Sequence, residues 1–82
     1  MRRVKVLMFG PVRDLTGAAE LTLELAEPCT GAAAFEALVA RYPALGPWRV
    51  SVRLAVNCEY APFERTLESD DELSFIPPVS GG

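Results

Sequence analysis

Residues 30–42, with the sequence TGAAAFEALVARY, carry the one clear helical signal of this 82-residue chain. Thr30 can cap the start of a helix with its side-chain oxygen, and Pro43 ends it because proline cannot donate an intrahelical hydrogen bond. The alanines of this stretch favour a helix and let it lie close to a sheet. Large apolar side chains recur between the two ends at helical spacing, at Phe35, Leu38, Val39 and Tyr42.

Segments typical of β-strands lie on both sides of this helix. Residues 4–9 are β-rich and end at a Gly-Pro turn signal, and residues 21–25 alternate strictly between apolar and polar. On the other side, we expect strands over residues 52–57 and 72–76, and a short strand over residues 59–61 after a tight turn.

The remaining stretches are expected as connections. They are residues 11–17, with room for one helical turn over residues 12–15, and the irregular residues 44–48, which contain Gly46-Pro47. Residues 62–67 form a crossing segment, and residues 69–71 form a turn.

The order of these elements predicts an α+β fold, in which one helix packs across a mixed sheet of four to five strands. Few topologies place one helix over a β-hairpin and return the last strand to the middle of the sheet. The β-grasp, or ubiquitin-like, fold is the commonest of these at this length. We therefore predict a β-grasp domain over residues 1–76 and a flexible C-terminal tail over residues 77–82.

Composition and charge exclude several classes of function. The net charge of −3 argues against nucleic acid, and nothing approaches a membrane span or a signal peptide. The chain has no histidine, and neither Cys29 nor Cys58 belongs to a CxxC pair, so no metal site is expected. We interpret the two cysteines as small buried or half-buried thiols in a reducing cytoplasm.

The tail is the candidate reactive segment, because no other part of the sequence gathers groups that could do chemistry. Pro77 and Pro78 lack amide donors, so sheet pairing should stop there and the chain should leave along a stiff, extended path. The residues after them are Val79, Ser80, Gly81 and Gly82. A terminal glycine fits a narrow channel and leaves its carboxylate unhindered, and the six-residue tail can span about 20 Å.

The faces of the outer strands predict a second feature. If Val4, Val6 and Met8 face the helix together with Leu73 and Phe75, large apolar groups remain on the opposite face of the sheet. These are Leu7, Phe9 and Ile76, with Tyr60 beside them. These residues could form a docking patch for a partner. Alternatively, the sheet is simply apolar on both faces, or the strands pair in a shifted register, and the sequence does not separate these interpretations.

Charged residues outside the tail have mostly structural interpretations. Asp70, Asp71 and Glu72 fit a solvated turn better than a metal or acid–base site, because no partner ligands converge on them. Arg13 and Asp14 form either a surface pair or, for Arg13, an anchor for a partner's carboxylate. Trp48, next to Pro47, is expected to cover the edge of the core.

The sequence resembles the small subunit of molybdopterin synthase, the MoaD family, along essentially its whole length. The resemblance rests on the segments KVLMF (residues 5–9), VRDLTG (residues 12–17) and AVN (residues 55–57), and above all on DELSFIPPVSGG (residues 71–82). One departure lies in the last turn, where the family commonly has Asp-Gly-Asp and this chain has Ser69-Asp70-Asp71. Aspartate can take a left-handed turn position at some cost, so we interpret this as a local change.

The resemblance implies a sulfur carrier. The Gly82 carboxylate would be adenylated by an ATP-using activating enzyme similar to the ubiquitin E1 and converted to a thiocarboxylate by a persulfide donor. The tail would then enter the large subunit and deliver sulfur to cyclic pyranopterin monophosphate, in a heterotetramer with a central large-subunit dimer. Phe9, Tyr60 and Ile76 would form the apolar dock for both partners, and the chain itself would bind no cofactor and supply no catalytic side chain.

Three alternatives stay open. The same diglycine ending and fold suit a ubiquitin-like modifier that is ligated to lysines, although Lys5 is the chain's only lysine. A sulfur carrier of another pathway, such as thiamine synthesis, is a second alternative, but those relatives are shorter and usually lack the Pro-Pro-Val segment. The third is an interaction domain with an inert tail.

Overall fold

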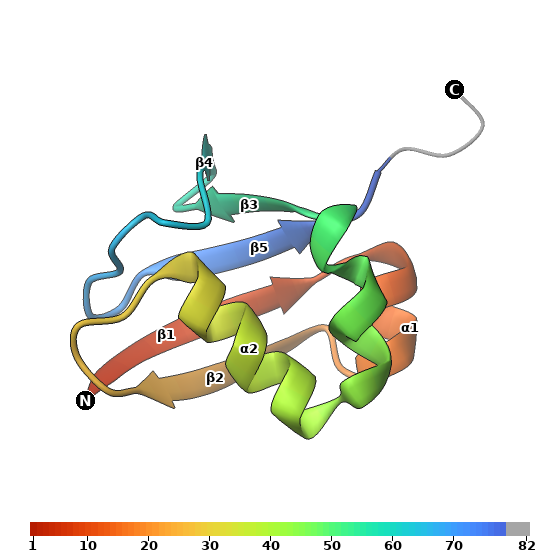
Figure 1. Cartoon of the computed structure of the whole chain (residues 1–82), viewed down its shortest axis with the longest axis horizontal. Coiled ribbons are helices and arrows are strands. Elements are labelled where there is room, and N and C mark those ends of the chain that lie inside the picture. The colour runs from red at the N-terminus through yellow and green to blue at the C-terminus, as the bar shows by residue number, and fades with distance from the viewer. Residues whose placement is uncertain (79–82) are drawn as a thin grey trace.

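A five-stranded mixed sheet with the order β2-β1-β5-β3-β4 forms the centre of the protein (Figure 1). Its strands are β1 (Arg2–Met8), β2 (Glu20–Leu25), β3 (Arg53–Val56), β4 (Glu59–Ala61) and β5 (Glu72–Ile76). The computed structural model describes residues 1–78. Because β5 runs parallel to β1 and antiparallel to β3, the last strand lies in the middle of the sheet, and the predicted fold class is confirmed.

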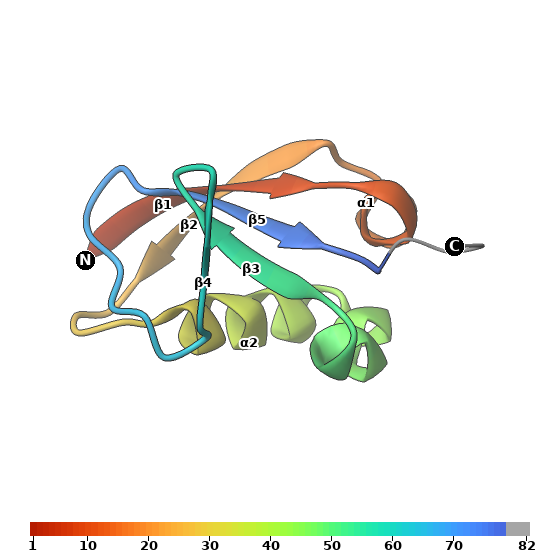
Figure 2. The ribbon, with the colours of Figure 1, turned by 90° about the horizontal axis from the view of Figure 1, so that it is seen from above.

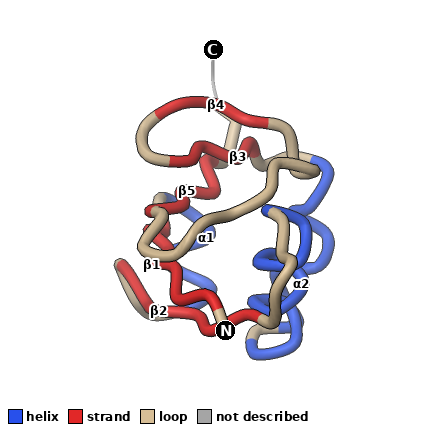
Figure 3. The backbone as a smooth tube through the Cα atoms, turned by 90° about the vertical axis from the view of Figure 1, so that its left-hand side faces the viewer, coloured by secondary structure: helices blue, strands red, loops and turns tan. Residues whose placement is uncertain are grey.

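Helix α2 (Gly31–Arg41) covers one face of this sheet, as Figure 2 and Figure 3 show from two directions. The Thr30 hydroxyl oxygen accepts a hydrogen bond from the backbone N–H of Ala33 at 3.2 Å, so the predicted N-cap is confirmed. Helix and sheet bury the core between them. The predicted inward set is confirmed, since all five of its side chains are buried: Val4, Val6, Met8, Leu73 and Phe75.

Aromatic side chains fix the helix on the sheet. The ring of Phe35, on α2, meets the ring of Phe75, on β5, edge to face with centroids 5.1 Å apart. Phe63, from the segment after β4, contacts both rings. Burying side chains of this size stabilises the fold by about 1.5–3 kcal/mol each, and edge-to-face pairing adds about 0.5–1.5 kcal/mol.

Two short helices stand where the sequence predicted connections. Helix α1 (Gly10–Thr16) replaces the expected single turn; Pro11 suits its first turn, and Gly17 ends it with φ of 72°. The 3₁₀-helix η1 (Pro43–Val50) replaces the expected irregular stretch. The prediction of a single helix is therefore wrong, since residues 1–78 contain two short helices besides α2. Gly and Pro residues interrupt a long helix, but they are compatible with helices as short as α1 and η1.

The turn before β5 is held by hydrogen bonds to the carboxylate of Asp71. The prediction of a solvated acidic turn is therefore wrong for this residue. Asp71 is buried, at 8% exposure. Its carboxylate accepts hydrogen bonds from Asn57 Nδ2 at 2.9 Å and from the backbone N–H of Glu68 at 2.8 Å. Asp70 takes the left-handed conformation, with φ of 69°, as the sequence predicted for that position. The carboxylate of Asp71 thus ties β5 to the β3–β4 turn.

The cysteines differ from each other in burial. Cys29 is buried, as expected, but Cys58 is exposed. Cys58 is the second of the two central residues of the tight β3–β4 turn, with φ of 71°. Within residues 1–78, no helix is long and apolar enough to cross a membrane. The same part of the chain contains no group of three or more His, Cys, Asp or Glu side chains that are placed to hold a metal ion together.

Candidate functional site

The tail leaves the fold from the end of the central strand. Sheet pairing stops at Ile76, which lies opposite Arg53 of β3, and Pro77 and Pro78 follow without amide donors. Pro77 passes close to Gly10, where an added Cβ would stand 3.4 Å from the proline Cγ and φ is 53°. The chain therefore emerges between the start of α1 and the start of β3 (Figure 1).

The sheet face opposite α2 divides into a charged part and an apolar part. Near the N-terminus it carries two cross-strand ion pairs, Arg3 with Glu24 at 3.1 Å and Lys5 with Glu20 at 4.0 Å. Toward the tail, Phe9 is 47% exposed and Tyr60 is 68% exposed, while Leu7 and Ile76 are half-buried. The face is thus apolar only around the tail.

The strand register excludes one of the readings that the sequence left open. Met8 pairs with Phe75 and Arg53 pairs with Ile76, so the expected faces hold and the slipped register is wrong. We call the apolar residues around the tail, Leu7, Phe9, Tyr60 and Ile76, the exit patch. Docking of a partner on the exit patch stays a prediction, as does the role assigned to each of its residues.

A groove of about 300 Å³ runs beside the exit patch. Its lining is Ser51, Arg53, Tyr60, Ile76, Pro77 and Pro78. The guanidinium carbon of Arg53 lies 5.9 Å from the centre of the Tyr60 ring, within the range of a cation–π contact. Sequence reasoning missed Arg53 as a site residue; its position opposite Ile76 could only be found from the strand pairing.

Arg13 lies on α1, in the turn that follows the Gly10–Pro77 contact. Among residues 1–78 it forms no ion pair with Asp14, so the surface-pair reading is wrong. Neighbouring helical residues point in different directions, which explains the absence of the pair. The reading of Arg13 as an anchor for a partner's carboxylate stays a prediction.

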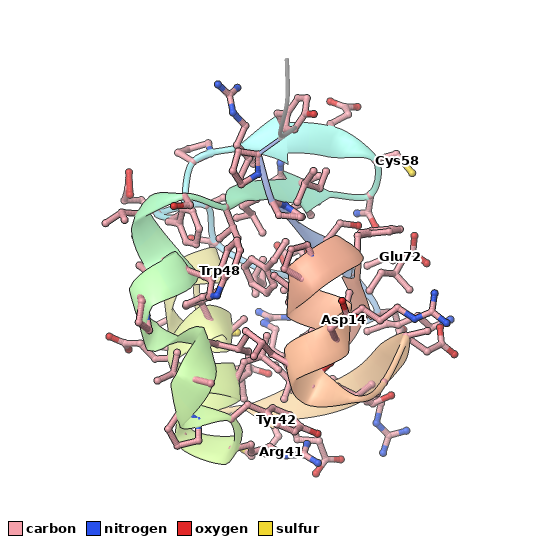
Figure 4. All side chains as sticks on the ribbon, turned by 90° about the vertical axis from the view of Figure 1, so that its right-hand side faces the viewer. Asp14, Arg41, Tyr42, Trp48, Cys58 and Glu72 are labelled. Carbon is pink, nitrogen blue, oxygen red and sulfur yellow. The ribbon has the colours of Figure 1, made fainter. Side chains whose placement is uncertain are left out.

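Trp48 is half-buried against the core and lies on η1, on the side toward α1 (Figure 4). The predicted position at the edge of the core is confirmed.

The predicted reactive residue, Gly82, lies outside the described residues, as do the predicted partner-binding residues Val79, Ser80 and Gly81. The structure therefore describes the base of the tail and the exit patch. Within residues 1–78 the exit patch and its groove contain no cysteine and no carboxylate, and the chain has no histidine.

The fold and site define a ubiquitin-like domain with a diglycine ending after its central strand. A model of the ThiS family matches residues 6–82, so the chain belongs to the ThiS family. The molybdopterin synthase sulfur carrier subunit of Arabidopsis thaliana is 40% identical over 96% of this chain and 82% of that protein. Its counterpart in Caenorhabditis briggsae is 39% identical over the full length of both chains. The predicted resemblance to sulfur carriers of molybdopterin synthase is confirmed.

Solved structures agree with this fold. SAMP1 from Haloferax volcanii matches with a TM-score of 0.88 and 25% identity, over 98% of this chain and 99% of that one. The small archaeal modifier protein 1 from Methanosarcina acetivorans has a TM-score of 0.84 and 27% identity, over 100% and 98% of the two chains. A complex of subunits 1 and 2 of the molybdopterin-converting factor from Helicobacter pylori matches in fold, with a TM-score of 0.68 and 23% identity over 98% and 99%.

Proposed function

We propose that this chain is the sulfur carrier subunit of a molybdopterin synthase and that the Gly82 carboxylate is the group that carries sulfur. The observation that carries the proposal is the full-length match to sulfur carrier subunits, together with the position of the tail. The tail starts at the central strand beside an exposed apolar patch, so a partner that docks there receives the tail directly. The chain acts as a subunit of a sulfurtransferase and works in the cytoplasm.

The chemistry begins with activation of the carboxylate, which is a poor electrophile. The Gly82 carboxylate attacks the α-phosphate of ATP on an E1-like activating enzyme, pyrophosphate leaves, and an acyl adenylate forms. The terminal sulfur of a persulfide then attacks the acyl carbon, and AMP leaves with the bonding electrons. A thiol then cleaves the sulfur–sulfur bond of the resulting acyl disulfide, the bond that came from the persulfide, which leaves a thiocarboxylate on Gly82 and a disulfide on the donor side.

Delivery takes place in the large subunit of the synthase. The thiocarboxylate sulfur attacks a carbon of the bound cyclic pyranopterin monophosphate and displaces an oxygen substituent from that carbon. Water then hydrolyses the acyl–sulfur bond, which returns the carboxylate of Gly82 and leaves the sulfur on the pterin. Two such deliveries build the dithiolene. Tethering holds the sulfur at a high local concentration beside the pterin. ATP and the acid–base groups belong to the partners, and this chain binds no cofactor of its own.

Docking relies on the apolar exit patch. Exposed aromatic residues such as Phe9 and Tyr60 are typical of residues that dominate binding energy at protein interfaces. The complex of subunits 1 and 2 from Helicobacter pylori supports a large-subunit partner. We further propose that the assembly is a heterotetramer, in which two small subunits bind a central dimer of large subunits.

Intact-mass spectrometry tests the function. The full chain is incubated with its activating enzyme, ATP and a persulfide donor, and we expect the mass gain of one oxygen-for-sulfur exchange. A chain without Gly82 serves as the control and should gain nothing. A full chain that forms the adenylate but never the thiocarboxylate would contradict the proposal.

A protein modifier is the second candidate, favoured by the similarity to the small archaeal modifier protein 1. Both functions need an activated diglycine terminus, so the fate of that terminus separates them. Adducts of this chain on lysines of other proteins, without any thiocarboxylate, would support the modifier. Chains of this protein on itself are not expected, because its one lysine, Lys5, lies in β1 and pairs with Glu20.

A further inference from the structure

Within residues 1–78, the ion pairs involve none of the residues that line the groove beside the tail. The cations that pair with carboxylates in residues 1–78 are the N-terminal amine, Arg2, Arg3 and Lys5. Arg53, beside the tail, has no carboxylate within 4.0 Å and no side-chain hydrogen bond to any residue of the same range. Arg13, Arg41, Arg49 and Arg65 likewise have no carboxylate within 4.0 Å in this range, so what sets Arg53 apart is its place in the groove beside the tail.

The surroundings of Arg53 within residues 1–78 restrict the position of its guanidinium and leave its N–H donors free to bind a ligand. The Tyr60 ring lies 5.9 Å away, so it limits where the group can lie without using its N–H donors. The groove that Arg53 lines is otherwise formed mainly by Tyr60, Ile76 and the two prolines. When a partner covers such a groove, water leaves and a charged hydrogen bond becomes stronger than at an open surface.

We propose that Arg53 is a carboxylate-binding anchor of the exit patch, and that the protein receiving the tail places an aspartate or glutamate side chain against it. The planar guanidinium fork suits a carboxylate in a bidentate arrangement, which a lysine does not reproduce. A protein carboxylate is favoured over a nucleic acid phosphate because the groove lining holds one cation in an acidic chain. This inference rests on the proposed function, which supplies the tail-receiving partners.

Binding of Arg53 variants to the activating enzyme and to the large subunit tests the anchor. We expect Arg53→Gln to weaken binding to at least one of them roughly tenfold at low salt, and Arg53→Glu to weaken it further. Arg53→Lys should recover only part of the loss. High salt should shrink the difference between Arg53→Gln and the unaltered chain, since it screens the charge.

Arg41→Gln is the matched control. Arg41 also lies over a tyrosine ring, with 5.7 Å to the Tyr42 centroid (Figure 4), but it ends α2 and does not line the groove beside the tail. It should change affinity by less than about twofold. Thermal unfolding of each variant shows whether the fold is kept, since substitutions of exposed residues usually cost little stability.

The outcomes separate the anchor from the function. Equal affinity of Arg53→Gln and Arg41→Gln for both partners at low salt overturns the anchor, even when the unaltered chain gains sulfur normally. Failure of the unaltered chain to bind either partner or to gain sulfur overturns both. The anchor is also overturned if Arg53→Gln binds more weakly than the unaltered chain by the same factor at low and high salt. Such a loss of affinity would come from lost packing and not from a lost charge.

Discussion

The buried carboxylate of Asp71 shows how one residue can change the reading of an acidic cluster. Three acidic residues in a row, Asp70, Asp71 and Glu72, predict a solvated turn, and that holds for Asp70, which is exposed at φ of 69°. Asp71 instead accepts hydrogen bonds from Asn57 and Glu68. Asn57 also accepts one from the backbone N–H of Glu72 at 3.0 Å. Sequence alone gives no sign that two distant turns share these bonds.

We expect Asp71→Ala to lower the free energy of unfolding by about 2–3 kcal/mol, because it leaves the Asn57 amide and the Glu68 N–H without their acceptor. Asp70→Gly is the control. Glycine takes the left-handed conformation of residue 70 without strain, but it also increases the conformational entropy of the unfolded chain. The two effects oppose each other, so the free energy of unfolding should change by less than about 1 kcal/mol. Urea denaturation of both variants measures the difference, and equal midpoints would contradict the structural role of Asp71.

At the scale of elements, the contact between α2 and the sheet depends on a residue without a side chain. Gly31 opens α2, and a Cβ at this position would collide with Leu54 Cδ2 and lie 3.3 Å from the backbone oxygen of Phe63. Leu54 is buried in β3, so it has little room to move. Gly31 therefore sets how closely the start of α2 approaches the sheet.

Gly31→Ala should destabilise the protein by about 1–3 kcal/mol, the usual cost of overpacking a core. Gly46→Ala in η1 is the matched control. Its nearest neighbour, Val39 Cγ1, would lie 3.9 Å away in ordinary contact, so this variant should be neutral or gain up to about 1 kcal/mol. Thermal or urea unfolding measures both. A Gly31→Ala protein as stable as the Gly46→Ala protein would show that α2 can shift freely.

The elements that the sequence predicted well are those whose signals are local. The strand over residues 72–76 and the short strand over residues 59–61 match the structure, and Thr30 caps α2 as expected. Helix α1 was predicted as a single turn only and η1 was missed, because each is too short to show helical periodicity. In α1, Pro11 near the start and Gly17 just after the end were available as signals.

For the whole molecule, the sequence predicted the tail and the exposed aromatic residues, but not the geometry that joins them. Alternation along each strand identifies which residues share a face. Only the pairing of β5 with β1 and β3 places Ile76 next to Arg53 and brings Pro77 against Gly10. Long-range pairing of this kind leaves no local signal, so Arg53 could not be identified from its neighbours in the sequence.

A single exit patch implies that the two proposed partners bind one at a time. The large subunit should therefore inhibit thiocarboxylate formation by the activating enzyme, and more carrier should overcome the inhibition. Phe9→Ala or Tyr60→Ala should weaken both partners, each by about tenfold or more, since both side chains are exposed beside the tail.

Thr22→Ala, on β2 in the charged part of the same face, should leave both affinities within about twofold. Mass spectrometry of the carrier at increasing large-subunit concentration measures the competition. Unchanged sulfur loading at saturating large subunit would mean that the partners use different surfaces. The loaded tail could then pass between proteins held in one complex, whereas a shared patch forces the carrier to dissociate from the activating enzyme before it delivers its sulfur.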